Sequence, residues 1–161
     1  MPFTATNAIR LSAQLTGPGD LGTDTSALDM TYPMRLTNGT GADEADLMFK
    51  DTRQLAGGAT DDIDLTSVED AFGNALAAAE VVTIFLRSLD TNTTDLTIGG
   101  STADYSGIPD QTVTPGGIVF YHNAGTTGLG SVVDATGDII RIVNGSGAQA
   151  SYEIVVIARS A

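Results

Sequence analysis

The run Val81–Arg87 constrains the fold of this chain more than any other stretch, because only Thr83 and Arg87 in it are polar. Its first four residues are β-branched and Phe85 is aromatic, which favours a strand over a helix. At about 3.3 Å per residue the run would span about 23 Å, enough to cross a small β-sheet and too short for a membrane span. Side chains of both parities are apolar, so the run predicts a strand covered on both faces, in a sandwich interior or at a subunit contact.

Eight other segments have the composition of short strands and are separated by stretches rich in Gly, Asn, Asp and Thr. In chain order they cover residues 9–16, 28–36, 47–49, 63–65, 95–98, 118–121, 139–143 and 152–157. The first two alternate between apolar and polar side chains, which is typical of strands with one covered face. The first is expected to end at Gly17, where a Gly-Pro-Gly sequence begins. Pro33 in the second lacks a backbone donor, so that strand should lie at an edge or carry a bulge.

Three local features add further expectations. Residues 66–79 are the one plausible helix, with Thr66 or Ser67 as its cap, although residues 72–75 could instead form a turn. Residues 101–114 have few apolar anchors and predict a long loop. The strands at 139–143 and 152–157 flank an Asn-Gly pair, which predicts a hairpin between them.

The irregular spacing of the strands favours a sandwich with Greek-key connections over an alternation of strands and helices. We therefore predict an all-β fold, a jelly-roll-like antiparallel β-sandwich of eight or nine strands with at most one short helix. A chain of 161 residues is long enough to bury a sizeable core as a single domain. That domain is expected to cover residues 1–161, with residues 1–40 as either an extended N-terminal β-arm or a part that contacts a partner.

The charge balance argues against two classes of partner. The chain has seven basic and twenty acidic residues, which give it a net charge of −13. A nucleic acid or an anionic membrane is therefore not an expected partner. The chain has no cysteine, so it offers neither a disulfide framework nor a thiolate metal site. The N-terminus has no secretory-signal pattern, and no stretch is apolar enough to span a bilayer.

His122 is the only histidine and therefore the first candidate for a catalytic base. A Ser/His/Asp hydrolase could use it, but no Gly-x-Ser-x-Gly motif occurs and the sequence supplies no orienting partner. The alternative is a histidine at the surface, where the strand 118–121 ends. We favour the alternative and predict no catalytic residues and no enzymatic activity.

Oxygen-rich clusters raise the question of a bound ion. Asp61, Asp62 and Asp64 form one such cluster, and Asp90, Asn92 and Asp95 form another; neither matches the twelve-residue calcium loop. Solvated loop carboxylates explain both clusters. The Gly-Gly pairs at 57–58, 99–100 and 116–117 match no phosphate-binding motif and read as turns. The sequence therefore predicts no metal site, no cofactor-binding residues and no cofactor.

A family resemblance covers roughly residues 45–158. It is carried by the run from Asp51 to Leu65, by Asp70 to Leu76, and by glycine and apolar placements further along. The latter lie at residues 81–86, 97–100, 113–117, 137–140 and 152–157. On these segments the chain resembles small jelly-roll capsid decoration, or cement, proteins of tailed bacteriophages. Before residue 45 the resemblance is weak.

The resemblance implies a structural virion protein that binds the outer surface of a tailed-phage head shell and stabilises it. The implied partner is the major capsid protein of the shell, the implied location is the outside of the capsid, and the implied oligomer is a homotrimer. Residues 3–36 are expected to supply part of the shell contact. An alternative is a tail, fibre or head-surface module that binds host polysaccharide, to which Tyr105 and Tyr121 could contribute. A hydrolase that uses His122 or an acidic pair is a second alternative.

Overall fold

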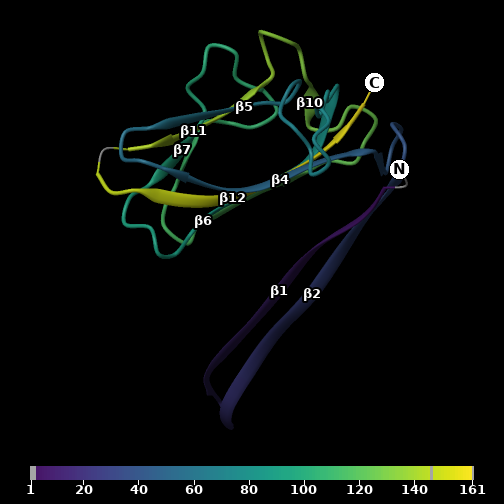
Figure 1. Cartoon of the computed structure of the whole chain (residues 1–161). Coiled ribbons are helices and arrows are strands. Elements are labelled where there is room, and N and C mark those ends of the chain that lie inside the picture. The colour runs from purple at the N-terminus through teal and green to yellow at the C-terminus, as the bar shows by residue number, and fades with distance from the viewer. Residues whose placement is uncertain (1–2, 146, 161) are drawn as a thin grey trace.

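The computed structural model describes residues 3–145 and 147–160, which contain twelve strands and no helix (Figure 1). The strands are β1 (Thr4–Gly19), β2 (Gly22–Asn38), β3 (Glu44–Ala45), β4 (Leu47–Leu55), β5 (Thr60–Asp64), β6 (Glu80–Ser88), β7 (Leu96–Ile98), β8 (Gln111–Val113), β9 (Ile118–His122), β10 (Gly130–Ser131), β11 (Ile139–Asn144) and β12 (Ala150–Arg159). All nine strands expected from the sequence are present. The additional ones, β3, β8 and β10, have two or three residues each, too few to leave a pattern.

The body of the molecule is a sandwich of two sheets, so the predicted all-β fold is confirmed. One sheet has the order β10-β6-β12-β4, with β9 also paired to β6, and the other has the order β5-β11-β7-β8. Alternate side chains from both sheets meet in one core, which includes Ile84, Leu86, Ile140, Ile142 and Ile154. The pairings within these two sheets are antiparallel, as in a jelly-roll-like sandwich.

The central strand predicted at Val81–Arg87 is β6. Ile84 and Leu86 point into the core, while Val82 lies in a second cluster on the other face with Leu36 and Ile157. The expected cover on both faces is therefore found at the start of β6. It is incomplete further along, because Phe85 is only half-buried.

Strands β1 and β2 form a long antiparallel hairpin, the arm, which projects from the body (Figure 1). Its register is unbroken from Thr4 opposite Thr37 to Gly19 opposite Gly22. The strand break expected at Gly17 is therefore wrong: both strands continue to a turn at residues 20–21. Among the described residues, β2 pairs with β1 along its length and with β3 only at residues 37–38. The other edge of β2 is therefore free at Pro33, in keeping with the prediction of an edge strand.

Residues 66–79 form turns and not the expected helix. The Asp64 carboxylate accepts hydrogen bonds from the backbone and hydroxyl of Thr66 and from the hydroxyl of Ser67. The Asp70 carboxylate likewise accepts from the backbone N–H groups of Phe72 and Asn74. These local bonds compete with helical ones, and the alternative of a turn near residue 73 is correct.

The hairpin expected between residues 139–143 and 152–157 is also wrong. β11 pairs with β5 and β7 in one sheet, whereas β12 pairs with β4 and β6 in the other. At the end of β11, the buried amide of Asn144 donates to the carbonyls of Leu55, Ala56 and Ala148 at 3.0 Å each. The loop expected at 101–114 is shorter than predicted, since it ends in β8.

Candidate interaction surface

The arm has one apolar and one polar face, because residues directly opposite each other in an antiparallel pair lie on the same side. On the apolar face Leu11 is opposite Met30 and Ala13 is opposite Leu28. On the polar face Arg10 bonds to Asp29 on the neighbouring strand, at 3.1 and 3.2 Å. The sequence pattern correctly separates the two faces, but both are exposed: the exposed fraction is 51% for Leu11 and 42% for Leu28.

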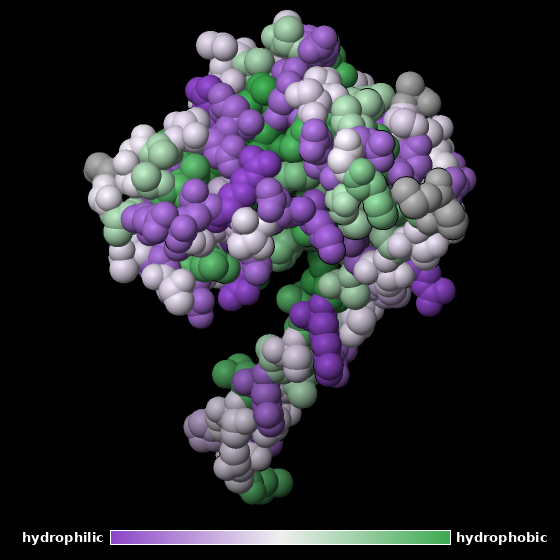
Figure 2. Space-filling model, viewed as in Figure 1, coloured by the Kyte–Doolittle hydropathy of each residue, from purple (hydrophilic) through white to green (hydrophobic). Residues whose placement is uncertain are grey.

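Figure 2 shows this exposure as apolar side chains along the arm and at its tip. The apolar face of the arm comprises Ile9, Leu11, Ala13, Leu28, Met30 and Tyr32. A two-stranded ribbon is at best marginally stable in water when nothing covers its apolar side. The apolar face of the arm is thus left largely exposed by the described residues of this chain.

The base of the arm is anchored to the body by apolar and polar contacts. Leu36 packs with Val82 and Ile157 in the second core cluster. Beside it, Nδ2 of Asn7 donates to the Thr83 hydroxyl at 3.1 Å, and that hydroxyl lies 2.8 Å from Nδ1 of His122. Residues from β1, β6 and β9 therefore fix the direction in which the arm leaves the sandwich.

His122 ends β9 as predicted, but it is half-buried rather than at the open surface. Thr83 accepts a hydrogen bond from Asn7, so it can donate its own proton to a neutral His122 through Nδ1. Burial lowers the pKa of His122, and the charge of Asp43 partly offsets this effect. The contacts of His122 are those of an anchor for the arm.

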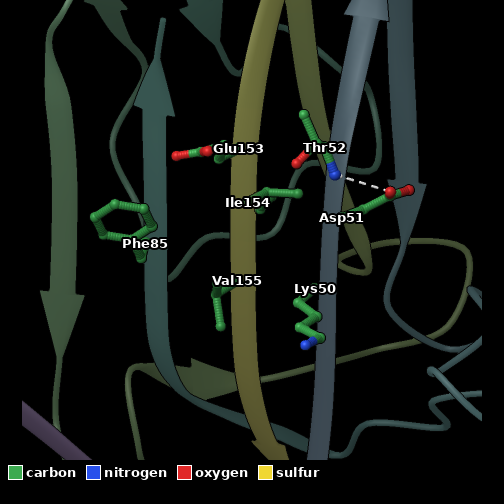
Figure 3. A pocket seen from close by; sticks show the side chains of 7 residues that line it. All are labelled: Lys50, Asp51, Thr52, Phe85, Glu153, Ile154 and Val155. Atoms are coloured by element: carbon green, nitrogen blue, oxygen red, sulfur yellow. Dashed lines mark hydrogen bonds between the residues drawn. The ribbon is translucent and has the colours of Figure 1, made fainter.

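The outer face of the five-stranded sheet, turned away from the core, is hollowed and rich in apolar side chains. A notch of about 590 Å³ between β1 and this face is lined by Phe85, Ile118, Phe120 and Val155, among others. A second hollow of about 420 Å³ shares Phe85 and Val155 with the notch and continues past Lys50 and Glu153 on β4 and β12 (Figure 3). Ile118, which lines the notch, is 59% exposed.

The carboxylates of the first acidic cluster bond to different partners. Asp61 accepts from Arg53 at 2.9 Å and from the Tyr152 hydroxyl at 2.5 Å. Asp62 accepts from Arg141 at 2.6 Å through both oxygens, and these hydrogen bonds hold the pKa of its carboxyl below the usual range. Each acid thus has a structural partner of its own.

The second cluster is dispersed in the same way. The side chain of Asn92 bonds to the Ser88 hydroxyl and to both backbone groups of Ser151, and Asp90 faces Arg87 at 3.9 Å. Within the ranges 3–145 and 147–160, no three His, Cys, Asp or Glu side chains gather in a way that could hold a metal ion.

The tyrosines considered for sugar binding face inward. Tyr105 is buried, and its hydroxyl donates to the carbonyl of Gly130 at 2.9 Å. The hydroxyl of Tyr121 accepts from the amide of Gln111 at 3.1 Å. Gly58 and Gly116 lie in turns with positive φ, which fits the expected role of those two glycine pairs. Gly99 and Gly100 also adopt positive φ but lie in an irregular segment after β7.

Arg159 is a structural residue that the sequence analysis missed. It is 1% exposed, pairs with Glu80 at 3.0 Å, and donates to the carbonyls of Glu44, Ala124 and Gly125. These bonds join β12 to β3 and to the loop after β9, close to the root of the arm. A single arginine near the end of a chain carries no sequence signal of such a role.

No protein-family model matches the chain, and the search of curated proteins finds no match either. Among the described residues, no helix is long and apolar enough to pass through a bilayer.

Proposed function

We propose that this protein is a structural virion protein, a decoration or cement protein that binds the outer surface of a tailed-phage head shell and stabilises it. The proposal combines the resemblance of residues 45–158 with one structural observation. That observation is the arm, whose apolar face is exposed in the isolated chain and needs a covering surface. An apolar sheet face and a projecting arm suit assembly with other proteins better than they suit a reaction.

The physical basis of the stabilisation is mass action. A protein that binds the assembled shell and not the free subunits lowers the free energy of the assembled state. The contact partner is the major capsid protein, and the arm supplies part of the contact. The acidic remainder of the surface, from a net charge of −13, keeps the outside of the particle soluble and complements basic patches on the shell.

The experiment is co-sedimentation of the purified protein with head shells that lack it, followed by heating of the decorated and bare shells. The proposal predicts saturable binding and a higher temperature of shell disruption. Protein that stays in the supernatant, while binding saturably to a host polysaccharide on a glycan array, would instead support the alternative of a host-attachment module.

A further inference from the structure

Two apolar surfaces of this chain lack a partner within the described residues. One is the apolar face of the arm beyond Ile9. The other is the outer-face hollow, which consists of the apolar notch beside β1 and the more polar hollow on β4 and β12 that adjoins it. The arm of the same chain does not fill the hollow, because only the first part of β1, up to Arg10, lines the notch. The rest of the arm points away from the body (Figure 1).

We propose that the apolar face of the arm packs into the outer-face hollow of a second copy of the same chain. Each copy provides one arm and one hollow, so a head-to-tail contact pairs these two surfaces and can close into a ring. The contact would cover the exposed side chains of Leu11 and Leu28 on one copy. On the next copy it would cover the half-buried Phe85 and the exposed Ile118. This inference deepens the proposed assembly role by naming the occupant of the arm's apolar face.

The charges favour a second copy in spite of the high net charge. The arm carries three of the twenty acidic residues and two of the seven basic ones, so it is nearly neutral. Its distal half, between Ala13 and Leu28, holds Asp20 and Asp24 and no basic residue.

The part of the hollow on β4 and β12 is lined by three charged residues, Lys50, Asp51 and Glu153. Asp51 pairs with Arg53 at 2.8 Å and Glu153 pairs with Arg87 at 3.6 Å. Lys50, the only lysine of the chain, makes no ion pair with any residue the structure describes. The acidic tip of the arm therefore complements the one charge of this lining that has no partner, the ammonium group of Lys50.

The test is sedimentation velocity of the full chain without shells, so that this inference and shell binding can fail separately. The wild-type protein should form a closed oligomer. The arm variant Leu11→Gln/Met30→Gln and the face variant Phe85→Gln/Ile118→Gln should each raise the dissociation constant at least about 100-fold. Ser12→Gln/Thr31→Gln, on the polar face of the arm, and Val133→Gln, an exposed apolar position in a loop, should leave it unchanged.

Mixing the two weakened variants gives the decisive result. The intact arm of the face variant can enter the intact hollow of the arm variant, so the mixture should contain a one-to-one dimer that neither variant forms alone. Circular dichroism and thermal melting establish that both variants are folded. A monomeric wild-type chain at high concentration, a face variant that oligomerises like the wild type, or a mixture that stays monomeric would overturn the proposal.

Discussion

The hydroxyl of Thr83 lies 2.8 Å from Nδ1 of His122 and 3.1 Å from the amide of Asn7, at the root of the arm. This small polar group links β6 and β9 of the sandwich to β1 of the arm. The orientation of the arm therefore depends on these three side chains, of which only His122 was considered as a catalytic base.

Replacing Thr83 with valine should loosen the root of the arm. Valine keeps the volume of threonine but leaves Asn7 and His122 without their shared partner, at a cost of about 1–2 kcal/mol in unfolding free energy. Urea denaturation measures this loss, and hydrogen exchange should speed up in β1 near Asn7. Thr31→Val, on the exposed polar face of the arm, is the matched control. Equal effects of the two substitutions would argue against an anchoring role.

The lowered pKa of His122 predicts a pH dependence of stability. An unfolded histidine has a pKa of about 6.5, so at mildly acidic pH the unfolded chain binds a proton that the folded chain resists. The contribution of His122 is complete above pH of about 6.5 and is lost as the pH falls through the lower pKa of the folded state.

The measurement is the unfolding free energy of the wild type minus that of His122→Gln, across this range. Taking the difference removes the titration of the carboxylates, which those two chains share. The difference should shrink on acidification. A constant difference would show that the pKa of His122 is the same in the folded and unfolded states.

Arg159→Met should destabilise the body far more than a surface arginine substitution. The substitution leaves Glu80 without its cation and three backbone carbonyls without their donor, and breaking a buried pair in this way costs about 3–5 kcal/mol. Chemical denaturation gives the value, with Arg10→Met in the exposed arm as the control. A loss no greater than that of the control would show that the network contributes little.

Shortening the arm should separate its role from that of the sandwich. A variant in which an Asn-Gly turn replaces residues 10–31 keeps the anchors at Asn7 and Leu36 and should retain a cooperative thermal transition. Because most of the apolar face is removed, its oligomerisation and its shell binding should both be lost. Shell binding by this variant at wild-type affinity would mean that the body alone carries the contact.

The position and type of the strands could be predicted because alternation and β-branching are local properties of the chain. Pairing could not be predicted in the same way. β11 and β12 read as a hairpin because an apolar stripe shows which side of a strand is covered, but not whether its neighbour in sequence lies beside it or across the core. The turns at Asp64 and Asp70 replaced a helix because each carboxylate bonds to backbone only two to four residues away.

The interaction surface was predictable only in part. The alternation in residues 9–16 and 28–36 identified the two faces of the arm. The same alternation of apolar and polar residues occurs whether the apolar face packs on the protein's own core or stays exposed. His122 was noticed as a single residue. Its contacts with Thr83 and Asn7 span 39 and 115 positions, and no spacing in the sequence brings them together.

Imaging of purified phage particles at a resolution that distinguishes the sandwich from its arm is the most direct test of the assembly role. The account predicts density for the sandwich on the outer surface of the head shell, in contact with the major capsid protein, with arms running between neighbouring copies. Density confined to the tail or its fibres, or particles that lack the protein altogether, would contradict it.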